Sequence, residues 1–161
     1  MLTPVRRRLA ALAMVLMLPA LGACTQQTAQ VYQPAVGVNN RSGTVDVLGA
    51  VVVAPSDGQG TFVASLVNKG QDSPDSLTSV TGDGLQAQVS APVKVQPDSL
   101  VNLADAGTVS VTGTDIRPGK FARLTLTFES GQETTINVPV VSADAEYADI
   151  KQARPSSSAT P

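Results

Sequence analysis

Residues 123–140 read RLTLTFESGQETTINVPV, and this stretch determines the fold class. Apolar and polar side chains alternate through 123–128 and again through 135–140, with the turn-forming segment ESGQ at 129–132 between them. Successive side chains of a strand point to opposite faces of a sheet, so a period of two buries one face and leaves the other in water. The stretch therefore predicts an antiparallel hairpin whose apolar face packs onto a core.

Short runs rich in Val, Leu and Thr continue upstream of this hairpin, separated by turn residues. Many short strands at regular spacing are typical of an all-β sandwich or barrel. The segment PSDG at 55–58 predicts a type I turn, and the nearly continuous apolar run before it predicts a strand that is buried on both faces or that starts a sheet. The further predicted strands are 44–53, 61–68, 77–80, 85–89, 93–95, 100–103 and 109–112.

Residues 1–23 have the three-part pattern of an export signal, with arginines at 6–8, an apolar stretch and then small residues. The alternative, a transmembrane anchor, is disfavoured because Pro19 interrupts an apolar segment shorter than the roughly 20 residues that a spanning helix needs. Residues 21–24 read LGAC, and this stretch resembles the bacterial lipobox. That resemblance implies that Cys24 carries a diacylglycerol and an N-acyl chain, which bind membrane lipid.

The mature chain divides into three predicted parts. Residues 24–43 are polar and rich in Gln, Asn and Gly, which predicts a flexible lipidated tether that spans roughly 25 Å. Residues 44–142 form the predicted β-sandwich domain. Residues 143–161 are predicted to be a mostly disordered tail, because they end in a low-complexity segment rich in Ser and Pro, with a short helix as an alternative over 143–150.

The composition excludes most catalytic and metal chemistry. The chain has no His, which removes Ser-His-Asp triads, Cys-His pairs and His-ligated zinc. Its only Met residues, Met1, Met14 and Met17, lie in the predicted signal, so the mature chain lacks the soft ligands that copper prefers. With 11 Lys and Arg against 13 Asp and Glu it also lacks the excess of positive charge typical of nucleic-acid binding. We therefore expect no enzyme activity, no metal, no nucleic acid and no cofactor besides the lipid on Cys24.

Two groups of carboxylates are candidate sites. Asp72, Asp75 and Asp83 lack the dense spacing of a calcium loop, so we interpret them as solvated turn residues. Glu129 and Glu133 could resemble the paired acids of a glycosidase, but at the tip of a hairpin they would have no cleft around them. We interpret this pair as the solvated end of the hairpin.

Three basic residues, Arg117, Lys120 and Arg123, cluster in the sequence just before the last hairpin. Such a cluster is a candidate docking patch for an acidic partner. The alternative is ordinary surface charge whose aliphatic stems cover apolar neighbours.

Several segments, in this order, resemble the periplasmic copper chaperones of the PCuAC type. FVASLVNKG at 62–70 and DSLTSV at 75–80 resemble the early strands of that family, and IRPGK at 116–120 with VPV at 138–140 resembles its final hairpin. The resemblance covers roughly residues 44–141. It implies a cupredoxin-like Greek-key β-sandwich.

The same resemblance locates the positions where PCuAC proteins bind copper. It places Thr108 and Ser110 where the family has a His-x-Met pair, and Ser90 near an earlier His. Hydroxyl groups do not replace imidazole and thioether as ligands of Cu(I). A closer resemblance is to actinobacterial lipoproteins of the LpqE type, which share the lipobox, the tether, the ligand-poor sandwich and a Pro/Ser/Ala-rich end.

These observations together predict a lipid-anchored lipoprotein on the extracytoplasmic face of the cell membrane. We expect it to act as a non-enzymatic accessory or interaction module. The resemblance implies a membrane respiratory complex, of the cytochrome oxidase kind, or another assembly of the cell envelope as its partner. The alternative is a copper-binding chaperone for extracytoplasmic oxidase metal sites.

The lipid anchor gives a direct prediction. The substitution Cys24→Ser removes the sulfur that would carry the diacylglycerol, so the protein should pass into soluble fractions or keep its signal uncleaved. Membrane fractionation with mass measurement of the N-terminus checks this. Normal processing with unchanged membrane retention would contradict it.

Overall fold

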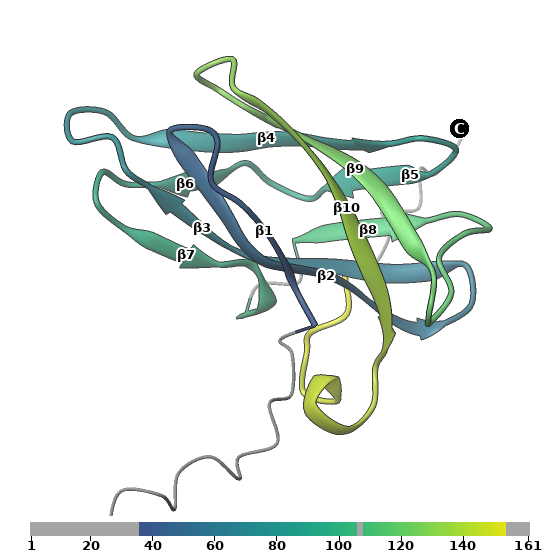
Figure 1. The fold of residues 1–161 in the computed structure, drawn as a ribbon. Helices are drawn as coiled ribbons and strands as arrows, with labels where there is room; N and C mark the ends of the chain where they lie inside the picture. Colours follow the sequence, from purple (N-terminus) through teal and green to yellow (C-terminus); the bar gives the residue numbers. More distant parts are fainter. Residues whose placement is uncertain (1–35, 106–107, 154–161) are drawn as a thin grey trace, which may run out of the picture. The chain divides into compact units, whose positions relative to one another are not determined.

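A computed structural model describes residues 36–105 and 108–153, so Cys24, the predicted signal and most of the predicted tether lie outside the described residues. The described residues contain a sheet of ten strands (Figure 1). The strands are β1 (Val38–Asn40), β2 (Val45–Ser56), β3 (Gln59–Asn68), β4 (Asp75–Gly82), β5 (Gln86–Val89), β6 (Val93–Val95), β7 (Leu100–Asn102), β8 (Val109–Thr112), β9 (Phe121–Phe128) and β10 (Glu133–Ser142). Two 3-10 turns, η2 (Leu103–Asp105) and η3 (Ala145–Tyr147), complete the elements. No helix in this part of the chain is long and apolar enough to cross a bilayer.

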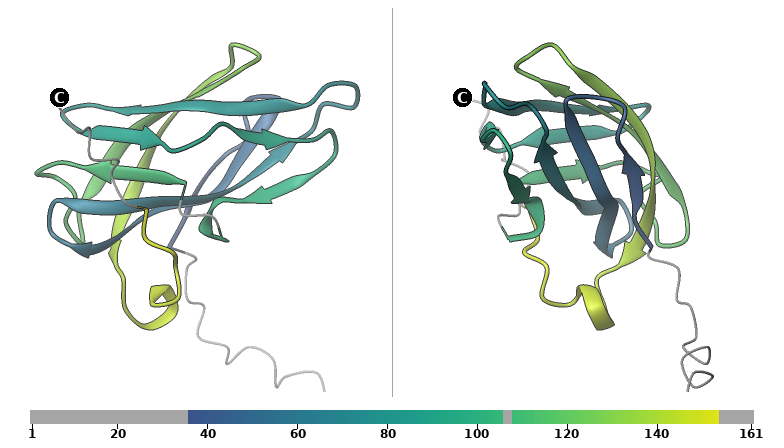
Figure 2. Two further views of the ribbon diagram at one scale, coloured as in Figure 1. Left: turned by 180° about the vertical axis from the view of Figure 1, so that it is seen from behind. Right: turned by 60° about the vertical axis from the view of Figure 1, so that its left-hand side comes forward.

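The strands follow the order β5-β8-β3-β2-β10-β9-β4-β6, with β1 beside β2 and β7 beside β3. Hairpins join β2 to β3 and β9 to β10, whereas β8 to β3 and β9 to β4 are neighbours through long connections. The first and last long strands, β2 and β10, pair in parallel through Val52 and Val140. The sheet thereby curls so that its two halves face each other across one core (Figure 2). The predicted all-β fold is confirmed.

The hairpin predicted at 123–140 is formed as expected. Ala122, Leu124, Leu126 and Phe128 are buried on one face of β9, and Leu124 pairs with Ile136 of β10. Gly131 has φ 86°, a conformation that glycine adopts without the steric cost of a side chain, and this lets the turn close. The alternating sequence pattern therefore predicted the hairpin and its buried face correctly.

One core fills the space between the two halves of the sheet. Its largest fully buried side chains are Phe62, Phe128, Leu66, Leu77, Leu103, Ile116, Leu124 and Leu126. Burying each side chain of this size stabilises the fold by about 1.5–3 kcal/mol relative to leaving it in water. These residues come from every part of the predicted sandwich, so the core depends on contacts between distant segments.

The turn after β2 differs from the prediction. Ser56 pairs with Gln59, so the loop consists of residues 57–58 and begins one residue later than a type I turn at 55–58 requires. Gly58 has φ 86°, a left-handed conformation that glycine adopts without the steric cost of a side chain. The predicted turn is therefore present but lies one residue later than expected, because β2 continues through Pro55 and Ser56.

The folded domain is longer than predicted at both ends. β1 lies within the predicted tether and pairs with β2, where Val38 faces Ala50. At the other end, residues 143–153 pack against the sheet, although the sequence predicted a mostly disordered tail from 143. We call residues 143–153 the C-terminal strap. The short helix considered for 143–150 is a single 3-10 turn.

The strap covers an apolar patch on the outer face of β2 and β3 (Figure 1, yellow). Val51, Val53 and Val63 form a small second cluster there, and Tyr147 and Ile150 of the strap pack against it. This outer patch explains why β2 is apolar on both faces, as the sequence predicted. Ordering a chain segment costs roughly 1–2 kcal/mol per residue, so a cluster this small leaves the strap with little net stability.

Candidate functional site

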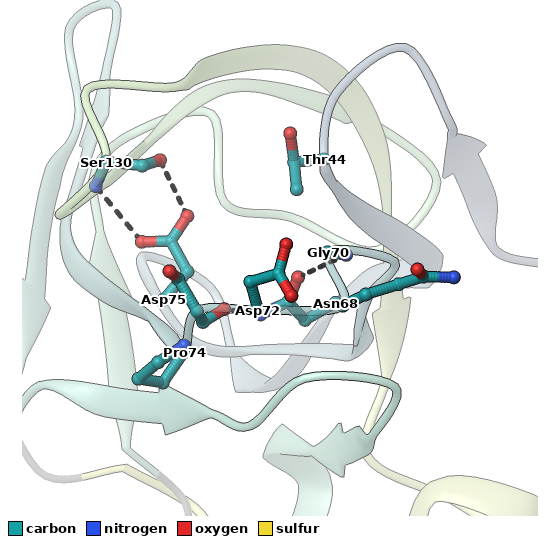
Figure 3. Close-up of a pocket in the computed structure, with 9 residues that line it drawn as sticks. Thr44, Asn68, Gly70, Asp72, Pro74, Asp75 and Ser130 are labelled. Atoms are coloured by element: carbon teal, nitrogen blue, oxygen red, sulfur yellow. Dashed lines mark hydrogen bonds between the residues drawn. The ribbon is translucent and has the colours of Figure 1, made fainter.

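A hollow of about 240 Å³, lined largely by polar residues, lies between the loop after β3 and the turn between β9 and β10 (Figure 3). Its volume is just below the usual range for small-molecule sites, which begins at roughly 300 Å³. The side chains that matter for its chemistry are Thr44, Asn68, Asp72, Asp75 and Ser130.

Asp75 joins the wall of this hollow to the hairpin turn. Its Oδ2 accepts a hydrogen bond from Ser130 Oγ at 2.6 Å, and its Oδ1 accepts from the backbone N–H groups of Ser130 and Ser76 at 3.1 and 2.8 Å. The side chain is 5% exposed. A buried carboxylate without partners is strongly disfavoured, and here three donors compensate for the lost water.

The interpretation of Asp75 as a solvated turn residue was therefore wrong. The sequence shows its polar neighbours but not the distant hairpin turn that donates to it. Asp72 and Asp83 are exposed, as expected. In the part of the chain that the structure describes, no group of three or more His, Cys, Asp or Glu side chains could hold a metal ion.

Asn68 shapes the opposite wall of the hollow. Its Nδ2 donates to the carbonyls of Ser73 and Val95 at 3.0 and 3.2 Å, and its Oδ1 accepts from the Gly70 N–H at 2.8 Å. The side chain is buried, so these bonds hold the loop after β3 in place. The Asp75 carboxylate is thus engaged by Ser130 and Ser76, and the Asn68 amide by the loop after β3, so both buried polar side chains of the hollow already have partners.

The three residues of the predicted docking patch are all exposed. Arg117 Nε lies 3.6 Å from Asp57 Oδ2, and Arg123 Nε lies 3.8 Å from Asp83 Oδ2. Asp57 belongs to the turn after β2 and Asp83 to the turn after β4, so each arginine faces a different turn. Exposed pairs of this kind contribute little to stability, but they offset part of the positive charge that Lys120 and the arginines would present.

The positions that the PCuAC resemblance singled out do meet in space. Ser90 follows β5 and donates through its backbone N–H and its Oγ to the Thr108 carbonyl, at 2.8 and 3.0 Å. Ser110 is the second residue of β8 and pairs with Gln88 of β5 and Thr61 of β3. The resemblance therefore located a genuine spatial cluster.

This hydroxyl cluster is partly covered by the strap. Ser110 is 5% exposed, and a small hollow of about 130 Å³ separates β8 from Gln152 and Ala153. Thr61 Oγ1 accepts a hydrogen bond from the Ala153 N–H at 2.7 Å and lies 3.1 Å from Gln152 Oε1, to which it donates. The end of the strap thus lies directly over the neighbours of Ser110.

The donors at this cluster do not suit copper. Ser90, Thr108 and Ser110 offer neutral hydroxyls, and Ser90 Oγ is already engaged as a donor. Cu(I) selects thiolate, thioether and imidazole ligands, and the chain supplies no His and no Met beyond residue 17. The cluster can form hydrogen bonds, but as it stands it is not a copper site.

Comparison with solved structures shows which fold this is. The apo PCuAC domain from PmoF1 superposes with a TM-score of 0.57 at 23% identity, over 65% of this chain and 99% of that domain. The described residues have a PCuAC-type fold. The copper-bound PCuAC domain from PmoF2 matches with a TM-score of 0.54 at 24% identity, over 65% of this chain and 98% of the domain.

The apo form of the PmoF2 PCuAC domain agrees, with a TM-score of 0.52 at 24% identity over 67% of this chain and 98% of that domain. No family model matches the chain. No curated protein matches it. The predicted cupredoxin-like sandwich and the PCuAC resemblance are thus confirmed as a fold, and the resemblance to actinobacterial lipoproteins stays a prediction.

Two structural features of this PCuAC-type domain had no clear signal in the sequence. Gln132 in the hairpin turn forms two hydrogen bonds with Val45, the first residue of β2. Its Oε1 accepts from Val45 N–H at 3.0 Å and its Nε2 donates to Val45 O at 2.9 Å. The hydrogen bonds of Thr61 with Gln152 and Ala153 of the strap join residues about ninety positions apart. Tyr147 and Ile150 are the only large apolar residues of this segment, and both pack against the valines of β2 and β3.

The bond between Asp75 and Ser130 leads to a stability prediction. Ser130→Ala removes one donor from a buried carboxylate, which should lower the free energy of unfolding by about 1–3 kcal/mol. Thr125→Ala is the matched control, because it removes an exposed hydroxyl pair and should change stability by less than about 0.5 kcal/mol. Chemical denaturation of both variants measures the difference, and equal losses would contradict a special role for Asp75.

Proposed function

We propose that this chain is a non-enzymatic accessory protein of the cell envelope, which works by binding a protein partner and not by holding an ion itself. One observation carries the proposal: a PCuAC-type fold in which hydroxyls stand at the ligand positions that the resemblance assigns. We infer that docking to a protein is the activity left to a domain that has this fold without the ion's ligands. A shared fold does not by itself establish a function, so the residues of the site decide between binding an ion and binding a protein.

The lipid anchor and the partner complete this proposal. Diacylation and N-acylation of Cys24 would hold the domain at the extracytoplasmic face of the membrane, with residues 25–35 as the tether. The domain is acidic, because eight Lys and Arg remain against thirteen Asp and Glu once the signal is removed. Its attachment would therefore rest on the acyl chains and not on attraction to anionic lipid. A membrane respiratory complex is the partner that the sequence resemblance suggests.

A second candidate is a copper chaperone, and the copper-bound PCuAC domain from PmoF2 favours it. Fold likeness supports this candidate more than it supports a pure interaction module. The hydroxyl groups of Ser90, Thr108 and Ser110 argue against a copper chaperone, because hydroxyls have no strong affinity for Cu(I). Copper could then be handled only with ligands that a partner protein supplies.

Titration with Cu(I) separates the two candidates. The fragment 25–161 retains the whole described domain with its core and lacks the methionines of the signal and Cys24. We expect it to bind no Cu(I) with submicromolar affinity in competition with a chromogenic chelator. Tight one-to-one binding by the fragment alone would overturn the proposal in favour of the copper chaperone.

A variant provides the positive control for this titration. Thr108→His combined with Ser110→Met introduces the ligand pair that the resemblance places at these positions. We expect the double variant to gain Cu(I) affinity over the unaltered fragment. The control shows that the assay would detect copper at this face if the ligands were present.

A further inference from the structure

We propose that the C-terminal strap is a displaceable cover on the outer face of β2 and β3, and that a partner's polypeptide segment competes with it there. The inference rests on the proposed function and names the surface through which the partner would bind. It depends on three features of the structure: the apolar character of the covered face, the way the strap is attached, and the chemistry of the strap itself.

The covered face is apolar in a position where an open sheet normally meets water. Val51 and Val53 of β2 and Val63 of β3 point away from the main core and are at most 8% exposed. Their cover comes from Ala143, Tyr147 and Ile150 of the strap, with Ala104 and Val141 at the edges. Without the strap, this face would present a contiguous patch of branched aliphatic side chains.

Hydrogen bonds attach the strap to the sheet at its two ends. At the start, the Ala143 N–H donates to the Ala54 carbonyl at 3.1 Å. At the end, Thr61 Oγ1 accepts from the Ala153 N–H and donates to Gln152 Oε1. Between these points two backbone hydrogen bonds are internal to the strap, from Tyr147 N–H to Asp144 O and from Ile150 N–H to Tyr147 O.

This mode of attachment distinguishes the strap from the strands. The strap contributes no residue to the sheet and none to the main core cluster, which is complete without it. Segments with few buried contacts and few bonds to the rest of a protein open locally while the remainder stays folded. The Thr61 hydroxyl therefore acts as a latch whose release frees the strap without unfolding the sandwich.

The chemistry of the strap defines the segment that could replace it. An aromatic side chain, Tyr147, and a branched aliphatic one, Ile150, lie three residues apart and insert toward the valines. The other side of the strap is exposed and acidic, with Asp144, Glu146 and Asp149. A partner segment with an aromatic and an aliphatic residue at the same spacing would fit the uncovered face by the same contacts.

Hydrogen exchange of the full chain tests the latch. Thr61→Val keeps the shape of the side chain and removes both latch bonds, whereas Thr61→Ser keeps the hydroxyl. We expect the amides of Tyr147, Ile150 and Ala153 to exchange about tenfold faster in the valine variant than in the serine variant, from the loss of two hydrogen bonds. The amides of Leu124 and Leu126 in β9 should exchange equally in both.

Two results would overturn the latch. Equal exchange of the strap in both variants would show that Thr61 does not hold it. Parallel acceleration of the strap and β9 would show that the strap unfolds only with the whole domain. Should Thr61→Val fail to fold, Ile150→Ala with Asp149→Ala as its exposed control applies the same comparison to the apolar contact.

A peptide of residues 143–153 probes the face as a binding surface. We expect a labelled peptide to bind the full chain carrying Ile150→Asp at least tenfold more tightly than the unaltered chain, whose own strap occupies the face. The same peptide with Ile150→Asp should not bind. Equal affinity for both chains, or self-association of the variant chain that excludes the peptide, would overturn the proposal. Copper binding by the domain would defeat the proposed function but leave both strap measurements unchanged.

Discussion

The parallel pairing of β2 with β10 is the constraint on which the rest of the structure depends. It joins the first long strand to the last through Val52–Val140, Val53–Val141 and Ala54–Ser142. Without this pairing the two hairpins would form separate open sheets with exposed apolar faces. With it the sheet curls around one core, and the chain leaves β10 beside the outer face of β2, where the strap begins.

Side chains of the β9–β10 turn reinforce this closure. Gln132 forms two hydrogen bonds with the backbone of Val45, and Ser130 forms two with Asp75 at the start of β4. One turn is thus bound to strands from both halves of the sheet. The polar hollow in Figure 3 follows from this arrangement, because the groups that line it are the ones that hold the turn. The polar side chains of Asp75 and Ser130 at this hollow therefore serve to bind the turn to β4.

Much of the fold was predictable because it follows from local patterns. Period-two alternation gave the β9–β10 hairpin, and the continuous apolar run gave a β2 buried on both faces. Ser90, Thr108 and Ser110 could be grouped only through resemblance, since β5 and β8 are not adjacent in the chain. The burial of Asp75 and the latch on Thr61 could not be predicted, because each depends on a partner far away in the sequence.

The central claim is that this PCuAC-type domain acts through a protein partner. The most direct test is a mild-detergent pull-down of the tagged, lipidated chain from its own membranes, with the Cys24→Ser form as control. The account predicts stoichiometric recovery of a membrane protein with the lipidated chain and its loss with the control. Recovery of the lipidated chain alone would contradict a stable partner. Binding of an ion or a small ligand would then be the favoured function.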